Sequence, residues 1–458
     1  MLNIVSVFLL QGISFFTAPL FTRLLGTEQY GTLSVYGSWV SIVTCIMGMN
    51  VGSSLATAKY KFKDYYSYRS SALLLGTLIS AVMTALGIIF KDTIASFMGM
   101  RGHGEEIALL MVVAAFANFI SNFSQTSFIY EKKAHINFLY SLTITVTSTG
   151  LSLLLAFLFS SDERYYGKIL GGVAPTVLAA VIMWFVIFMK KPALPNKTYW
   201  KFAITFGAPL VFHSLSREVL VHSDKIMMQA FKVPDGDIGI YSVFYSLTAI
   251  LGTILTALNN AWCPFYYDDL NEKAYDRLNK KCSHYLELFT VLCCGFILLS
   301  REVGRIYAGE EYYSGIGVFP ILALAIYFTL MYQFPVNYEF FFKKTYIVAI
   351  GTAGAALVNI GLNAVLIPME GPFGGMIGAA IATALSYFAL FCCHMFIVSR
   401  MKEKYHLKLR KFLPGLLAVC VCAVLFYVLE DQWYIRWCAG AALGVFELVR
   451  IVKRKSIF

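Results

Sequence analysis

The chain has 458 residues, of which 58% are apolar and 14% are charged. A soluble fold cannot cover so much apolar surface, and runs of about 18 or more apolar residues recur along the whole chain. The composition therefore excludes an ordinary soluble protein and predicts a polytopic α-helical membrane protein. Lys and Arg (37) outnumber Asp and Glu (26), and we attribute this excess to loops beside the membrane rather than to a nucleic-acid partner.

Six apolar segments predict the spans of a first half. Each is about 20 residues long and is separated from the next by polar residues. The first apolar stretch has no basic leader and no Ala-x-Ala-like site, so we interpret it as a span rather than a signal peptide. The six spans are predicted near residues 2–21, 31–55, 71–90, 107–130, 137–160 and 169–189.

Eight further apolar segments follow. We expect an all-α membrane protein of about 14 transmembrane helices, with two six-helix pseudo-repeat bundles and two C-terminal helices. The second bundle is predicted near 204–231, 238–262, 283–300, 315–341, 345–368 and 375–399, and the additional helices near 412–429 and 433–449.

A loop rich in Pro and Lys separates the two halves. It contains Pro192 and Pro195 and follows six spans, where a boundary between bundles is expected. We therefore predict a first lobe at 1–190, a cytoplasmic linker at 191–201, a second lobe at 202–399, and two more transmembrane helices with a basic cytoplasmic tail at 400–458.

Basic residues are distributed unevenly between the two sets of loops. With the N-terminus inside, cytoplasmic loops carry 26 of the 37 Lys and Arg, the opposite loops carry nine, and the seventh span carries two. Lys and Arg accumulate on the cytoplasmic side of membrane proteins. The count therefore predicts a multi-pass membrane protein with both termini in the cytoplasm.

Three motifs carry a resemblance to a known family. The first leads into the second span, and the second repeats the same element in the second half: YGTLSVY at Tyr30–Tyr36 and IGIYSVF at Ile238–Phe244 share Gly, Ser and Val at matching offsets. The third combines an Asn-rich and a Gly-rich block around Pro368. The motifs are PLFTRLLGTEQYG at Pro19–Gly31, DKIM and IGIYS at Asp224–Met227 and Ile238–Ser242, and NIGLN and GGMIGAAIAT at Asn359–Asn363 and Gly374–Thr383.

With these motifs the whole chain resembles the polysaccharide transporter family, the Wzx-type branch of the multidrug, oligosaccharidyl-lipid and polysaccharide (MOP) exporter superfamily. The resemblance implies a MATE-like fold and a flippase for undecaprenyl-pyrophosphate-linked oligosaccharide repeat units. Transport by alternating access would serve the assembly of capsule, O-antigen, exopolysaccharide or teichoic acid. Membrane lipid is then a partner, and the polymerase and glycosyltransferases of the same pathway are candidate partners.

The chain departs from the family pattern at its start, where family members usually carry a further stretch before the position of Asn3. Pro19 lies 12 residues before Gly31, whereas Pro209 lies 30 residues before Gly239. We therefore expect the first span to be shorter at its start than the seventh.

Two alternative functions belong to the same superfamily: a lipid II flippase and a cation-coupled multidrug antiporter, whose cavity should be lined by carboxylates. A membrane enzyme of polysaccharide synthesis is disfavoured, because the loops are short and no catalytic constellation or Walker-type Gly-Lys-Ser/Thr motif occurs. The ten cysteines show no Cys-x-x-Cys spacing and no nearby histidine cluster. We expect no enzyme activity, no cofactor and no metal site.

The seventh predicted span is interrupted by charged residues and histidines. Charges at membrane depth cost about 2.5 to 3.5 kcal/mol each, so they face a bundle interior or a watery cavity. At about 100° per residue, the polar residues form two adjacent stripes: His213, Arg217 and Asp224 within about 40°, and Glu218, Lys225 and His222 within about 60°. We predict that this side lines a substrate cavity, where Arg217, and in second place Lys225, contacts the pyrophosphate.

The predicted cavity residues are Arg217, Lys225, Arg23, Asp224, Glu218 and His213. Arg23 is included as a second cationic contact from the first half, with an interfacial anchor as its alternative. For the seventh span the alternative is that Arg217 pairs with Asp224 and Glu218 with Lys225 or His222, or that 222–225 lie at the outer interface. Glu339 lies four residues before Lys343, so we expect an interfacial ion pair there rather than a proton or sodium relay.

Overall fold

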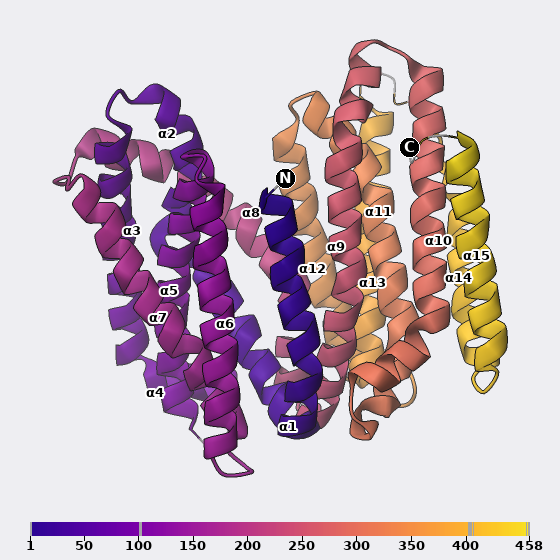
Figure 1. Ribbon diagram of the computed structural model, residues 1–458, viewed down its shortest axis with the longest axis horizontal. Coiled ribbons are helices and arrows are strands. Elements are labelled where there is room, and N and C mark those ends of the chain that lie inside the picture. The colour runs from indigo at the N-terminus through magenta and orange to yellow at the C-terminus, as the bar shows by residue number, and fades with distance from the viewer. Residues whose placement is uncertain (1, 100–102, 402–404, 406, 455, 457–458) are drawn as a thin grey trace. The chain divides into compact units, whose positions relative to one another are not determined.

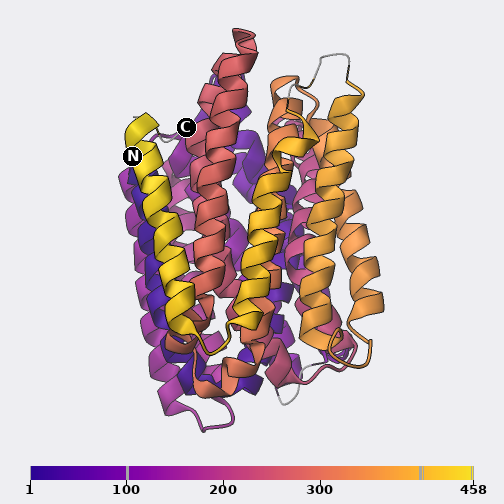
Figure 2. The ribbon, with the colours of Figure 1, turned by 90° about the vertical axis from the view of Figure 1, so that its right-hand side faces the viewer.

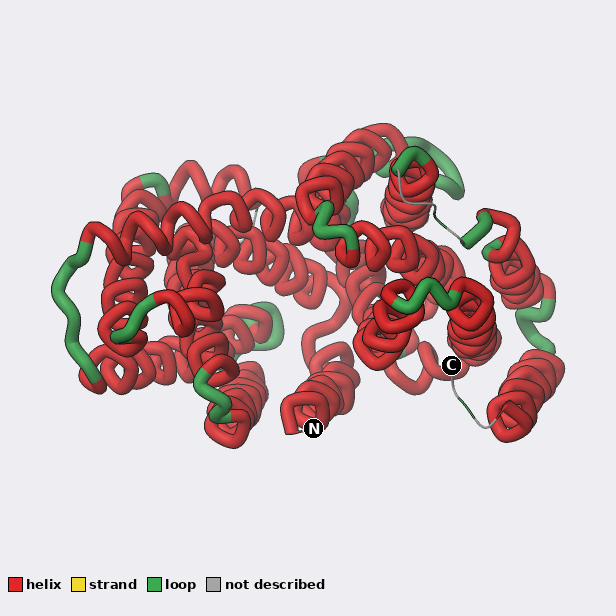
Figure 3. The backbone as a smooth tube through the Cα atoms, turned by 90° about the horizontal axis from the view of Figure 1, so that it is seen from above, coloured by secondary structure: helices red, strands yellow, loops and turns green. Residues whose placement is uncertain are grey.

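The structure is a computed structural model made of long helices connected by short loops (Figure 3). It describes residues 2–99, 103–401, 405, 407–454 and 456, and no strand occurs in these ranges. Eleven helices among the described residues are long and apolar enough to cross a membrane. The prediction of an all-α, multi-pass membrane protein is therefore confirmed. Four of the basic residues counted above lie outside the described residues: Arg101, Lys402, Lys404 and Lys455.

The helices follow one another along the chain as labelled in Figure 1. The first elements are α1 (Leu2–Ile46), the 3₁₀ segment η1 (Met47–Ser54), α2 (Leu55–Lys61), α3 (Tyr65–Ile89), α4 (Lys91–Met98), α5 (Gly104–Tyr130), α6 (Ala134–Leu158), α7 (Arg164–Lys190) and α8 (Lys197–Ala230). The remaining elements are α9 (Asp235–Asn271), α10 (Tyr275–Tyr307), η2 (Glu310–Val318), α11 (Phe319–Phe341), α12 (Thr345–Leu366), α13 (Gly375–Ser399), η3 (Leu409–Lys411), α14 (Leu413–Val428) and α15 (Trp433–Arg454).

Internal contacts divide the chain into two compact units, Met1–Gly239 and Ile240–Phe458. The boundary falls at the start of α9 and not in the linker predicted at 191–201. The reason is that α8, which follows this linker, packs against α1 and η1. The seventh predicted span thus belongs to the first unit by its contacts.

Each predicted span coincides with helical structure, but the first two spans form a single helix, α1. Gly26 interrupts this helix with φ 69° and ψ 176°, a conformation that is essentially restricted to glycine. The polar stretch predicted between the two spans is therefore a glycine kink, and the helix continues on both sides of it.

The repeated glycine motif brings α1 into close contact with the first turn of α9. A Cβ atom built on Gly31 would lie 1.9 Å from the carbonyl oxygen of Asp235, and one built on Gly239 would lie 2.0 Å from that of Thr27. No side chain larger than hydrogen fits at either position. The two glycines that the sequence places at matching offsets therefore make one tight helix crossing.

The second predicted span unwinds near its end, in η1. Gly48, Met49 and Asn50 have left-handed φ values of 62°, 49° and 52°, which cost about 1–2 kcal/mol for each residue other than glycine. An unwound backbone at membrane depth is tolerated only where it is buried in protein or lines a cavity. Gly207 of α8 covers this backbone closely, because a Cβ there would lie 2.5 Å from the carbonyl oxygen of Met49.

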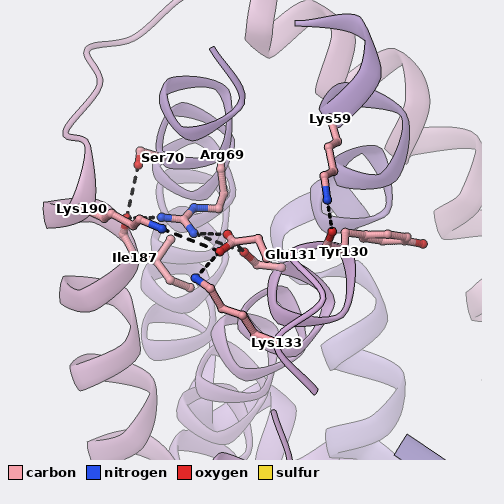
Figure 4. A network of polar contacts seen from close by, with 9 residues as sticks. Lys59, Arg69, Ser70, Tyr130, Glu131, Lys133, Ile187 and Lys190 are labelled. Carbon is pink, nitrogen blue, oxygen red and sulfur yellow. Dashed lines mark hydrogen bonds and ion pairs between the residues drawn. The ribbon is translucent and has the colours of Figure 1, made fainter. Parts of the chain in front are cut away.

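A buried ion-pair network ties together the ends of α3, α5, α6 and α7 (Figure 4). Arg69 forms an ion pair with Glu131 and donates a hydrogen bond to the carbonyl oxygen of Ile187 at 2.9 Å. Lys133 and Lys190 approach the second Glu131 oxygen at 2.5 and 3.9 Å. Because the side chains of Arg69 and Glu131 are almost fully buried, each depends on the other for its charge to be compensated.

In the second unit, α14 and α15 lie beside α10 (Figure 2). The guanidinium of Arg436 on α15 is buried, forms an ion pair with Glu302 and donates a hydrogen bond to the carbonyl oxygen of Leu298 at 3.2 Å. Arg301 likewise pairs with Glu430 in the loop between α14 and α15. Arg450 and Arg454 at the other end of α15 pair with Glu287 of α10, so ion pairs attach α15 to α10 at both ends.

Glu339 is buried inside the second unit. Its side chain is 0% exposed and pairs with the equally buried His394 of α13, whereas Lys343 is exposed in the turn that follows α11. The expectation of an interfacial pair between Glu339 and Lys343 is wrong. Sequence spacing favoured the lysine, but α11 packs against α13 and brings the histidine closer.

We predict that Gly31→Ala and Gly239→Ala each destabilise the protein by about 1–3 kcal/mol, since the added methyl groups must push the two helices apart. Gly37→Ala, on the same helix, has no atom within 4 Å of the added Cβ and serves as the control. Thermal unfolding in detergent would measure the differences. Equal melting temperatures for Gly31→Ala and Gly37→Ala would contradict the close crossing.

We predict that Arg69→Leu lowers the free energy of unfolding by about 3–5 kcal/mol, because it leaves Glu131 buried without its main partner. The double variant Arg69→Leu/Glu131→Leu should recover most of this loss. Thermal or denaturant unfolding of the purified variants provides the measurement. A double variant no more stable than the single one would show that the charge pair is not responsible.

The same network predicts that the stability of the protein depends on pH. Burial acts to raise the pKa of Glu131, but the hydrogen bond from Lys133 and the charge of Arg69 outweigh it and lower the pKa. The stabilisation from Glu131 is therefore complete above its unfolded pKa of about 4.3 and is lost as the pH falls through the lower folded value. The stability difference between wild type and Glu131→Gln should shrink in that acidic range.

Candidate functional site

The first unit contains a polar pocket of about 690 Å³ between α1, η1, α5 and α8. Polar side chains within membrane helices normally face a protein interior or a water-filled cavity, and here most of the wall is polar. The lining residues are Ser41, Thr44 and Cys45 of α1; Met47, Asn50, Gly52 and Ser53 of η1; Asn118, Phe119, Asn122, Phe123, Thr126 and Tyr130 of α5; and Ser214, Arg217 and Glu218 of α8.

One wall of the pocket is a polar stripe on α5. Asn118, Asn122, Thr126 and Tyr130 recur every fourth residue and therefore share one helix face. Asn122 is exposed and Asn118 is half-buried. The stripe presents amide and hydroxyl groups, which both donate and accept hydrogen bonds.

The unwound segment η1 supplies a second wall. Its left-handed turn places Asn50 on the pocket, and Ser53 donates a hydrogen bond to the Asn50 carbonyl oxygen at 2.8 Å. Gly48 contacts the ring of Phe119 so closely that a Cβ would lie 2.1 Å from it. The break in the helix is thus held by glycine packing on one side and borders the pocket on the other.

Arg217 and Glu218 bring charge to the pocket. They form an ion pair at 2.7 Å between Nη2 and Oε1, and His222 Nε2 lies 3.3 Å from the other Glu218 oxygen. The side chain of Arg217 is 66% exposed, whereas that of Glu218 is 17% exposed. The guanidinium therefore has donors open to the pocket, while the carboxylate is occupied by its two neighbours.

The other predicted cavity residues do not line this pocket. Asp224 and Lys225 are buried near the end of α8, His213 is half-buried one turn before Arg217, and Arg23 is exposed on α1. The alternative pairing of Arg217 with Asp224 does not occur, because Arg217 pairs with Glu218. The alternative pairing of Glu218 with His222 does occur. The structure thus brings two of the six predicted residues into one pocket.

The pocket suits a ligand that is rich in hydroxyl groups and carries negative charge. Amides and hydroxyls exchange hydrogen bonds with sugar hydroxyls, and a guanidinium binds phosphate oxygens in a fork. Within the described ranges, no three His, Cys, Asp or Glu residues are placed to hold a metal ion. All ten cysteines are free thiols.

Sequence reasoning missed Asn50, Asn118 and Asn122. The two α5 asparagines carry a readable signal, because polar residues four apart in an otherwise apolar span indicate a face turned away from lipid. Asn50 carries a weaker one, since its position depends on the left-handed turn of η1. The sequence prediction relied on charged residues in α8 and did not consider the neutral asparagine side chains.

Comparison with known proteins places this pocket in a family context. The sequence model of the family described as "polysaccharide biosynthesis protein" matches residues 1–267, which include every residue of the pocket. The "Lsg locus putative protein 1" of Haemophilus influenzae is 22% identical over 395 residues, which cover 82% of this chain and 93% of that protein.

Solved structures share the fold. "Lipid II flippase MurJ, inward closed conformation" superposes with a TM-score of 0.77 at 15% identity, covering 99% of both chains. The inward-facing structure of "a multidrug resistance MATE family transporter of the MOP superfamily" gives 0.66 at 13% identity, covering 90% of this chain and 95% of the other. The MATE-like fold expected from the sequence is confirmed.

Cysteine labelling would test whether the pocket holds water. In a parent protein lacking the ten native cysteines, we predict that Asn122→Cys reacts about tenfold or more faster than Ser124→Cys with a charged, membrane-impermeant thiol reagent, since only hydrated thiols ionise and react. Ser124 lies two residues away on α5 and is fully buried. If Asn122→Cys reacts as slowly as Ser124→Cys, the pocket is closed to water.

Proposed function

Because this chain belongs to the family of polysaccharide biosynthesis proteins, we propose that it is a flippase for undecaprenyl-pyrophosphate-linked oligosaccharides. It would move repeat units across the bacterial cytoplasmic membrane by alternating access, for the assembly of a surface polysaccharide such as capsule, O-antigen, exopolysaccharide or teichoic acid. The orientation with both termini in the cytoplasm, predicted from the 26 basic residues on one side, is part of this proposal.

The observation that carries the proposal is the exposed guanidinium of Arg217 inside a pocket of amides and hydroxyls. A lipid-linked sugar crosses the membrane only if its hydroxyls and phosphates exchange water for other polar partners, because hydrocarbon offers none. Asn118, Asn122 and Asn50 would satisfy hydroxyl groups, and Arg217 would compensate phosphate charge. The polyprenyl tail needs no such site and would remain in the bilayer.

The charge of the pocket weighs against the antiporter alternative. An exporter of cationic drugs needs uncompensated carboxylates, but Glu218 is neutralised by Arg217 and lies beside His222. A lipid II flippase remains the second candidate, supported by the structural likeness to such a protein. Its substrate also combines a pyrophosphate with sugars, so the pocket chemistry suits both.

We predict that Arg217→Ala reduces surface polysaccharide at least about tenfold, as expected when one charge-assisted phosphate contact of about 1.5–3 kcal/mol is removed, while the amount of protein in the membrane is unchanged. Arg217→Lys should retain part of the activity, because it keeps the charge but not the fork. Surface polymer in a deletion strain carrying each variant is the measurement.

Two further variants make the result specific. Lys201→Ala removes an exposed positive charge from the first turns of α8, outside the pocket, and should leave export normal. Arg217→Ala/Glu218→Gln removes the carboxylate that the single variant leaves uncompensated, and should remain defective. Normal polymer in Arg217→Ala, or recovery in the double variant, would refute a direct role for the guanidinium.

A further inference from the structure

Glu339 and His394 form an isolated acid–base pair inside the second unit. His394 Nδ1 lies 2.9 Å from both oxygens of Glu339, and both side chains are 0% exposed. The pair joins α11 to α13 and takes no part in the pocket of the first unit. Titratable groups buried without water in a protein interior are costly unless they are paired.

The surroundings seal the histidine ring. A Cβ built on Gly351 of α12 would lie 2.6 Å from His394 Nε2, so the backbone of α12 closes that edge of the ring. Nε2 has no hydrogen-bond partner among the described residues. The ring of Tyr332 stacks against the His394 ring, with 6.4 Å between the two ring centroids. Because the side chain of His394 is 0% exposed, water reaches Nε2 only when the packing of the three helices loosens.

Few other titratable groups face the pair. Tyr332 comes from α11, Cys393 from α13 and Tyr405 from the segment after α13, and the charge of Glu339 acts on the last two. These groups are neutral near pH 7 in their ordinary state. Lys343 is exposed and Lys344 is half-buried in the turn that follows α11, where the Lys344 N–H donates to the Glu339 carbonyl oxygen at 2.9 Å.

The number of protons on the pair follows from its burial. With one shared proton the pair is neutral overall, either as imidazolium and carboxylate or as imidazole and carboxyl. Losing this proton leaves a net negative charge in a space without water, and gaining a second leaves a net positive one. Both states are penalised strongly by the low dielectric.

We propose that Glu339 and His394 form a proton-binding site that holds one proton while α11, α12 and α13 are packed together and releases it when water reaches the pair. In water the separate groups titrate near about pH 4.3 and 6.5. Above about pH 6.5 the hydrated pair therefore loses a proton that the packed pair keeps. By linkage, separation of these helices releases a proton and becomes easier as the pH rises.

The proposal goes beyond the proposed function, because it does not depend on which molecule is moved. Its test is the protonation of the His394 ring in purified protein, followed by NMR of ¹⁵N-labelled histidines and assigned with His394→Gln. A hydrated imidazole changes from mostly protonated to mostly neutral between about pH 5 and 8. The His394 signal should stay constant over that range, and the exposed His135 provides the internal reference.

Two variants separate a proton site from a merely structural contact. Glu339→Gln removes the charge that retains the proton, so the His394 signal should be that of a neutral ring at every pH in this range. Gly351→Ala pushes against the ring and should admit water, so His394 should begin to titrate. Both variants are compared only as monodisperse protein, which excludes misfolding as the cause.

The outcomes that would overturn the proposal are distinct. A wild-type His394 that titrates between pH 5 and 8, or a Glu339→Gln variant whose His394 ring gives the signal of a charged imidazolium, would show that Glu339 does not hold a trapped proton with His394. A His394 signal that shifts when sodium replaces choline at constant pH would identify a metal cation as the occupant instead. None of these results bears on polysaccharide export, so the proposed function stands or falls separately.

Discussion

A polar side chain within a membrane helix must find a partner inside the protein or water in a cavity, because hydrocarbon offers neither. This constraint accounts for the main features of the molecule. Arg69 and Glu131 compensate each other at the ends of four helices, and Arg436 binds Glu302 where α15 meets α10. On α1, η1, α5 and α8, polar groups line an open pocket instead.

The pocket depends on two departures from regular helix. Left-handed residues at Gly48–Asn50 unwind the second span, and glycines allow α8 to approach the unwound backbone closely. Strain of this kind persists only where the surroundings impose it, and it is concentrated at functional sites. The break supports the assignment of the pocket as the site on which the proposed transport depends.

The two units differ in how their charged side chains are placed. In the first unit the charged group of interest, Arg217, is exposed to a pocket and is suited to an anionic headgroup. In the second, Glu339 and His394 are sealed from solvent and suited to a single proton. A transporter needs a site for its substrate and groups whose protonation changes when the helices move. In both places the charge of each buried side chain is compensated by a neighbouring group.

Sequence alone determined the fold class, the helical structure of each predicted span and the family, because apolar periodicity and the glycine motifs are local properties of the chain. It also singled out Arg217, since a charge in an apolar span is visible without a structure. It could not distinguish a kink at Gly26 from a loop, because both require the same residue type.

Only the tertiary structure decided the partners. Glu218, not Asp224, pairs with Arg217, and His394, not Lys343, pairs with Glu339. In neither case did helical spacing indicate the observed partner, because Glu218 is the residue next to Arg217 and His394 lies on another helix. The neutral asparagines of the pocket likewise acquire their role from the unwinding of η1 and the approach of α8, which depend on contacts between residues far apart in the chain.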